Sequence, residues 1–141
     1  HQVFFDEMKN SDEKNYVMVT FFPKTISHLN ENVKILTDVR KIIKDKSREM
    51  VRYKCKNESR EMVRHKCKNE KEFRYLALPE ISKNGHPHLH FFIYHDLSED
   101  KIKKLKKRIE KEIKKRSIVK EFDVNIKRLE LNYENYSSPF N

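Results

Sequence analysis

Three histidines occupy alternate positions near the middle of the chain, at His86, His88 and His90. Side chains two positions apart on a β-strand point to the same face, so His88 and His90 are expected to project together, with the apolar residues beside them facing the other way. Pro87 lacks a backbone donor, so we expect regular strand pairing to begin after it. Neutral imidazole is a common ligand of divalent metals, and a strand would hold two rings side by side. His88 and His90 are therefore candidate metal ligands.

A carboxylate is expected close to this histidine pair. The segment 76–80 is mainly apolar and ends at Glu80, and 81–85 contains Asn-Gly, a strong turn signal. A hairpin with a turn at this point would return the chain so that Glu80 lies near the two histidines. One glutamate and two histidines form a mixed oxygen and nitrogen set that suits Mg²⁺ or Mn²⁺ and leaves positions open for a phosphate.

The sequence here resembles the histidine-hydrophobe-histidine (HUH) endonucleases. The resemblance is carried by His88-Leu89-His90 before an apolar run, and by Pro79-Glu80 before the glycine turn. This local form looks most like the rolling-circle replication initiators of small plasmids and viruses. It implies that His88, His90 and Glu80 bind Mg²⁺ or Mn²⁺. It also implies an enzyme, a nuclease and nucleotidyltransferase, that nicks and rejoins single-stranded or hairpin DNA at a replication origin through a phosphotyrosine intermediate.

The family places its nucleophilic tyrosine on a helix after the last strand. In this chain the resemblance puts that role on Tyr136 first and on Tyr133 second. Neither is followed by the lysine that the family usually carries three or four positions later, and Pro139 interrupts a helix from Tyr136. One alternative is that the nucleophile lies beyond residue 141. Another is that both tyrosines merely belong to a C-terminal tail.

Other interpretations of the same residues remain open. The pattern of His86, His88 and His90 also resembles the histidine-triad nucleotide hydrolases and transferases, in which His88 would attack phosphorus. That family relies on glycine-rich turns, whereas this chain has one glycine. A non-catalytic, basic single-stranded nucleic-acid-binding domain is a further alternative. An HUH transposase or relaxase shares the metal motif, and alternating histidines without a function are the simplest explanation.

Composition points to an anionic partner. The 141 residues form one expected domain, 1–141, with a net charge of +10 from 32 lysines and arginines against 22 acids. Such an excess attracts polyanions, nucleic acid first among them. No apolar run reaches transmembrane length and no signal-peptide pattern is present, so we expect no membrane partner and a cytoplasmic location in the host of a plasmid or virus. Cys55 and Cys67 match no zinc module and are expected to be free thiols.

A strongly basic helix is predicted over 98–116. Ser98 is a suitable N-cap, and one narrow apolar stripe leaves the remaining surface to lysine and arginine. A solvated face is the simpler interpretation, and contact with DNA phosphates is the functional one. The candidate DNA-binding residues are Lys103, Lys104, Lys107, Lys111 and Lys114.

The remaining elements predict an α+β protein. We expect a mainly antiparallel sheet of about five strands with helices packed on it, as in the HUH and RRM-like α/β sandwiches, and 1–15 is a loose arm able to add an edge strand. The other predicted elements are a helix over 29–46, in which Val33 belongs to the apolar stripe, and strands over 16–22, 76–80, 88–94 and 122–131.

A tandem duplication follows the first predicted helix. The segment 47–58 is repeated almost unchanged at 59–70, with Tyr53 replaced by His65. Within each copy apolar and basic residues alternate, which favours a half-buried strand and allows a hairpin of the two copies. A recent accident without function and an added basic finger that contacts DNA are both open.

Overall fold

The computed structural model describes residues 14–25, 28–52 and 73–131. These residues form four strands and two helices in the order βαββαβ, which is the order of the ferredoxin-like split βαβ fold. The elements are β1 (Asn15–Pro23), α2 (Leu29–Arg52), β2 (Tyr75–Ile81), β3 (Pro87–Ile93), α4 (Glu99–Lys115) and β4 (Phe122–Glu130).

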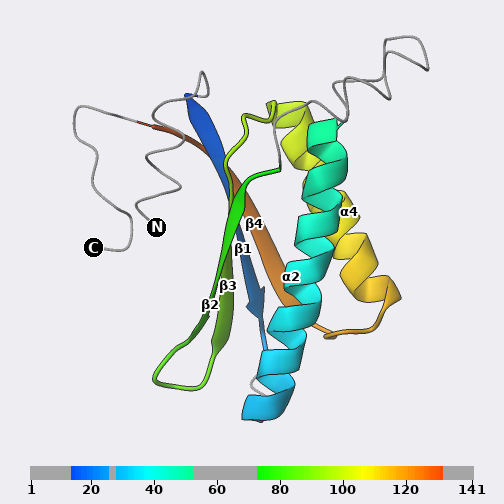
Figure 1. The fold of residues 1–141 in the computed structure, drawn as a ribbon. Helices are drawn as coiled ribbons and strands as arrows, with labels where there is room; N and C mark the ends of the chain where they lie inside the picture. Colours follow the sequence, from blue (N-terminus) through cyan, green and yellow to red (C-terminus); the bar gives the residue numbers. More distant parts are fainter. Residues whose placement is uncertain (1–13, 26–27, 53–72, 132–141) are drawn as a thin grey trace.

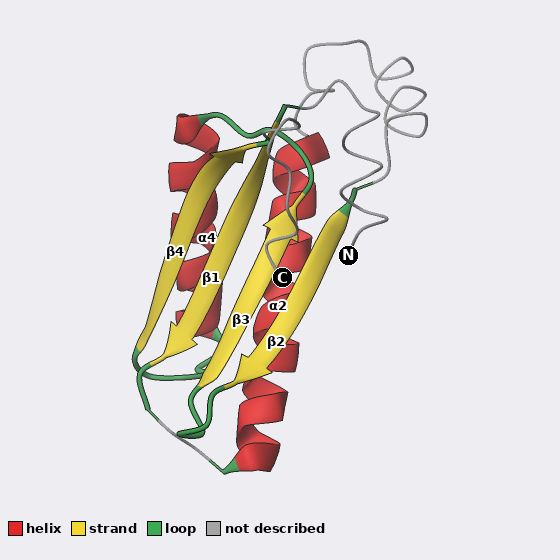
Figure 2. Ribbon diagram, turned by 90° about the vertical axis from the view of Figure 1, so that its left-hand side faces the viewer, coloured by secondary structure: helices red, strands yellow, loops and turns green. Residues whose placement is uncertain are grey.

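The strands form one antiparallel sheet in the order β2-β3-β1-β4. Both helices cover the same face of the sheet (Figure 1). Figure 2 looks onto the other face, which we call the open face because no described helix lies in front of it. The predicted α+β class, with helices packed on an antiparallel sheet, is confirmed, with four described strands where about five were expected. Most of the predicted N-terminal arm lies outside the described residues.

The two central strands build the core through their alternation. Val17, Val19 and Phe21 of β1 are fully buried, as are Leu89 and its alternate neighbours in β3. These side chains meet the apolar stripes of both helices in one cluster. Since successive side chains point to opposite faces, burying this set places the residues between them on the open face.

Helix α4 forms as the sequence predicts. The Ser98 hydroxyl accepts a hydrogen bond from the Lys101 backbone N–H at 3.3 Å, which makes Ser98 the N-cap. This cap satisfies one of the backbone donors left free in the first turn. The stripe that packs on the sheet consists of Ile102, Leu105, Ile109 and Ile113.

Helix α2 is longer than predicted and corrects the interpretation of the duplication. The helix continues from the expected end near residue 46 to Arg52, so the first half of 47–58 is helical and not a strand. The physical reason is a continued helical stripe, because Ile43, Ser47 and Met50 are all buried at spacings of four and three residues. The rest of the duplication, with both cysteines, lies outside the described residues.

Among the described residues, neither helix has the length and apolar content needed to cross a membrane. Both α2 and α4 are rich in charged side chains on the surface that faces away from the sheet.

The central position of Ile109 predicts a measurable effect on stability. Ile109 is fully buried between α4 and the sheet. We expect Ile109→Ala to lower the free energy of unfolding by about 2–5 kcal/mol, through lost burial and the cavity left behind. The exposed Lys107 of the same helix provides the control, since Lys107→Ala should change stability by less than about 0.5 kcal/mol. Urea unfolding followed by circular dichroism measures both, and equal effects of the two changes would contradict the packing described.

Candidate active site on the open face of the sheet

The hairpin of β2 and β3 places the three predicted metal ligands on one face of the sheet and brings Glu80 into contact with His90. Glu80 is the cross-strand partner of His88, and its Oε2 lies 3.4 Å from Nε2 of His90. Directly opposed side chains on one face have their Cβ atoms about 4.5–5.5 Å apart, so Glu80 starts from a position opposite His88 while its carboxylate contacts His90. The expected hairpin and the expected approach of Glu80 to the histidine pair are therefore confirmed.

The turn between the strands explains this register. Gly85 has a φ of 81°, a value at which a side chain would be strained, and its N–H donates to the carbonyl of Ser82 at 2.9 Å. The N–H of His86 donates to the Ser82 hydroxyl at 3.2 Å. His86 thus belongs to the turn, before β3 begins at Pro87, and is not part of the pair on the strand.

The donor types suit a divalent cation, but the side chains are not gathered as a complete ligand set. The His88 ring packs edge-on against Phe22, with ring centroids 4.6 Å apart, and the centroids of His88 and His90 are 6.5 Å apart. Within the described ranges, no group of three or more His, Cys, Asp or Glu side chains is close enough to hold a metal ion. Joint coordination by Glu80, His88 and His90 would need these side chains to leave the arrangement described here.

The pair of Glu80 and His90 is open to solvent. The side chain of Glu80 is 63% exposed and that of His90 is 29% exposed. An exposed pair of this kind adds little to folding stability, because water screens the charge interaction. Its accessibility is what a binding site needs, since an ion or a phosphate can reach it from the open face.

An apolar pocket of about 570 Å³ adjoins the pair. Tyr16 and Phe92 lie on its wall with ring centroids 6.4 Å apart, an arrangement able to hold a flat ligand such as a nucleobase. The lining residues are Tyr16, Met18, Leu78, Pro79, Glu80, His90, Phe92 and Leu129. The sequence interpretation overlooked this pocket, although apolar residues on both faces of the 16–22 segment were a signal for it.

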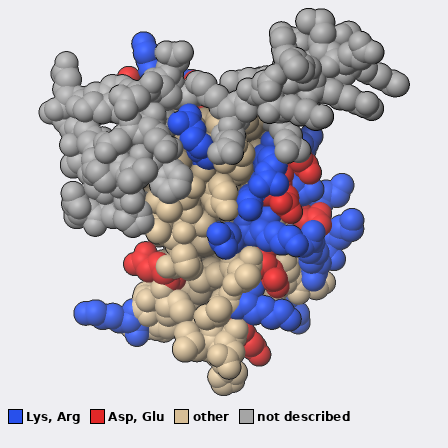
Figure 3. All heavy atoms as spheres, viewed as in Figure 1, with Lys and Arg blue, Asp and Glu red and all other residues tan. Residues whose placement is uncertain are grey.

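The predicted DNA-binding lysines are not brought to this site. Lys103, Lys104, Lys107, Lys111 and Lys114 are exposed on α4. Helix α4 packs on the helix-covered face of the sheet, opposite the face that carries the histidines. In Figure 3 the lysines and arginines gather over the helices on the right-hand side. A phosphate held at His90 therefore cannot touch these lysines.

The predicted nucleophiles Tyr133 and Tyr136 lie outside the described residues, so the structure does not place them.

His95, just after the end of β3, is buried, and its Nε2 accepts a hydrogen bond from the Arg74 backbone N–H at 2.9 Å. This contact ties the end of β3 to the start of β2.

Comparison with known proteins adds no functional assignment. No family model and no curated protein matches the chain. A solved structure, the de novo designed protein Foldit4, is 17% identical and covers 85% of this chain and 100% of its own, with a TM-score of 0.42. A likeness this distant carries no argument about function.

The half-buried Tyr16 predicts a loss of stability in alkali. Burial raises the pKa of the Tyr16 hydroxyl above its usual value of about 10. Once the pH exceeds about 10, tyrosine ionises in the unfolded chain before it does so in the folded protein, so stability falls as the pH rises through the folded pKa. We expect the native protein to lose more stability than Tyr16→Phe between about pH 8 and about pH 11. Urea unfolding at both values tests this, and equal losses would show that Tyr16 is not the cause.

Proposed function

We propose that this chain is a metal-dependent endonuclease that nicks and rejoins single-stranded DNA at a replication origin through a phosphotyrosine intermediate. The observation that carries the proposal is the contact of Glu80 with His90, opposite His88, on an accessible sheet face. A carboxylate and two imidazoles at this point are the ligand types that the resemblance to the HUH endonucleases requires. The basic chain, with a net charge of +10, agrees with a polyanionic substrate.

His88, His90 and Glu80 would hold Mg²⁺ or Mn²⁺ in this proposal. The ion would polarise a phosphate and offset the charge that develops during transfer. The strand geometry supplies the orientation, because His88 and His90 share a face and the directly opposed Glu80 comes from the neighbouring strand. The tyrosine hydroxyl attacks phosphorus and displaces the 3′ oxygen of the preceding nucleotide, and the reverse transfer rejoins the strand.

The open face suits a single strand of DNA. The apolar pocket next to His90 contains aromatic rings on which a base can stack, while the phosphate stays at the exposed edge near Glu80. The lysines of α4 lie on the opposite layer, so we assign them to long-range attraction of DNA and to flanking segments of the substrate. Electrostatic attraction of this kind raises association rates and weakens steeply with salt.

A second candidate function is non-catalytic binding of single-stranded nucleic acid. It is favoured by the aromatic pocket together with the separation of the His88 and His90 rings, which keeps the ligand set incomplete in this arrangement. A protein of this kind would bind single strands without forming a covalent product.

Replacing both histidines tests the enzyme. Labelled single-stranded oligonucleotides that carry candidate origin sequences are incubated with the full chain and Mn²⁺, and covalent protein–DNA product is measured on a denaturing gel. We expect a product from the native chain and a loss of at least about 100-fold from His88→Ala with His90→Ala, since removal of metal ligands abolishes charge stabilisation. His28→Ala is the matched control, because His28 is exposed just before α2 and should leave the product unchanged.

The tyrosine variants locate the nucleophile. If Tyr136→Phe removes the product and Tyr133→Phe does not, the attack is assigned to Tyr136, and the converse assigns it to Tyr133. Mn²⁺ binding, measured by calorimetry, should be lost in the double histidine variant and kept in both tyrosine variants. Binding of single strands with neither Mn²⁺ affinity nor covalent product, in a chain extended at its C-terminus as well, would favour the non-catalytic candidate.

A further inference from the structure

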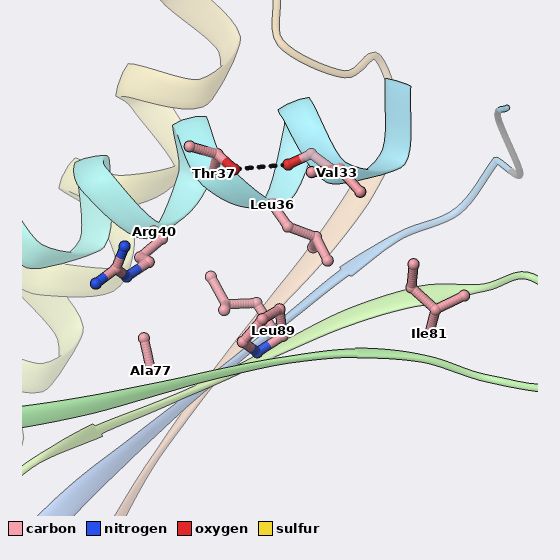
Figure 4. Close-up of a pocket in the computed structure, with 8 residues that line it drawn as sticks. Val33, Leu36, Thr37, Arg40, Ala77, Ile81 and Leu89 are labelled. Atoms are coloured by element: carbon pink, nitrogen blue, oxygen red, sulfur yellow. Dashed lines mark hydrogen bonds between the residues drawn. The ribbon is translucent and has the colours of Figure 1, made fainter. Parts of the chain in front are cut away.

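A second concavity lies on the helix-covered side of the sheet, between α2 and the edge strand β2. Its volume is about 470 Å³, and it lies across β2 from the pocket beside the histidines, with Pro79 on the border of both. In Figure 4, Val33 and Leu36 project from α2 toward the strands, with Ile81 at one end and with Arg40 and Ala77 at the other. We call it the edge groove, and its lining residues are Val33, Leu36, Thr37, Arg40, Ala77, Pro79, Ile81 and Leu89.

Small side chains on β2 create the edge groove. The central strands fill the space under the helices with large residues such as Phe21 and Phe91, both fully buried. On β2 the corresponding helix-facing positions carry Ala77 and Pro79, which are too short to reach α2. The edge of the sheet and the helix therefore stand apart, and space remains between them.

The backbone of β2 also directs polar groups along this groove, away from β3. The Tyr94 N–H donates a hydrogen bond to the Arg74 carbonyl at 3.0 Å. The Ser82 N–H donates to the His86 carbonyl at 2.9 Å, so the even-numbered residues at both ends of β2 bond to β3 and the turn. Because such pairs alternate in antiparallel strands, the odd-numbered residues of β2 direct their N–H and C=O groups away from β3. Among the described strands none pairs with this edge. Pro79 lacks a backbone N–H, so this edge offers one hydrogen-bond donor fewer to an added strand, while its other backbone groups can still pair.

One half of the edge groove is apolar and exposed. Val33 is 51% exposed and Ile81 is 40% exposed, although each is a large apolar side chain. This corrects the predicted place of Val33 in the buried stripe of the first helix, and the reason is the gap left by the small residues of β2. An exposed apolar patch beside an unpaired strand edge is typical of a protein interaction site.

A basic row on α2 begins at Arg40, at the other end of the edge groove, and continues beyond it. Arg40, Lys44 and Arg48 follow one another at four-residue spacing on α2, so they share one face of the helix. The Lys44 Nζ lies 5.3 Å from the ring centroid of Tyr75, and the Arg48 Cζ lies 6.0 Å from that of Phe73. Within the part of the chain that the structure describes, none of the three forms an ion pair with a carboxylate. Together they form a cationic ridge that continues the line of the groove along β2.

We propose that the edge groove binds an extended segment of a partner protein, which adds to β2 as a strand. The segment places apolar side chains between Val33 and Ile81 and acidic side chains against Arg40 and Lys44. Strand addition gives affinity through the backbone, and the alternating side chains give specificity. The apolar half favours a peptide over a nucleic acid, because a phosphate backbone gains nothing from Val33, Leu36 and Ile81. This surface lies on the face of the sheet opposite the histidines, and Pro79 of β2 borders both concavities.

A designed peptide tests the proposal. The probe is fluorescein-Thr-Val-Thr-Ile-Thr-Glu-Thr-Glu-Thr, together with its reversed sequence, so that either strand direction brings the acids to the cationic ridge. We expect one of the two to bind the full chain, measured by fluorescence anisotropy. Arg40→Glu with Lys44→Glu should weaken binding at least about tenfold. The matched control is Lys34→Glu with Lys41→Glu, which makes the same change of charge at exposed positions of α2 outside the groove and should weaken binding less than about threefold.

Two further measurements separate the proposal from simple charge attraction. A peptide with serine in place of valine and isoleucine should bind at least about tenfold more weakly, and the backbone amides of Tyr75 and Ala77 should shift in NMR spectra on addition of the original peptide. The proposal is overturned if neither peptide binds, or if the serine peptide binds equally well. It is also overturned if duplex DNA displaces the peptide while Val33→Ser leaves peptide affinity unchanged, since the ridge would then be a nucleic-acid surface. Circular dichroism checks that each variant is folded.

Discussion

The alternation of side chains along β3 is the constraint on which the rest of the structure depends. Leu89, Phe91 and Ile93 are fully buried beneath the helices in the centre of the sheet. Since a shift of one residue would exchange the two faces of the strand, this burial holds the register and forces His88 and His90 onto the open face. The candidate chemistry is thus positioned by a hydrophobic core to which the histidines themselves contribute nothing.

The fold divides the molecule into surfaces of different character. The open face carries the histidines, Glu80 and an apolar pocket with two aromatic rings. The helical layer carries most of the exposed lysine and arginine that Figure 3 shows on the right. A ligand placed at the histidines would meet a wall of aromatic and aliphatic residues. Most of the lysines and arginines among the described residues would act on it from the opposite layer, through the field of the protein.

Strand β2 links these surfaces because it lies at the edge of the sheet. Glu80 points to the open face, where it meets His90, while Pro79 and Ile81 point toward α2 and line the edge groove. A central strand could not do both, since its helix-facing side chains would have to fill the core. The short side chains Ala77 and Pro79 are tolerated here because the edge contributes less to the core than β1 and β3 do.

The sequence by itself determined the local features. Period-two alternation predicted β3 and its face of histidines, the Asn-Gly turn predicted the hairpin that brings Glu80 to them, and Ser98 predicted the start of α4, because each depends on neighbours close along the chain. Only the tertiary structure decided which face of the sheet each helix covers. It placed the basic surface of α4 opposite the histidines, extended α2 through the start of the duplication, and left Val33 exposed beside a groove. These outcomes depend on packing between segments far apart in sequence, which no local pattern encodes.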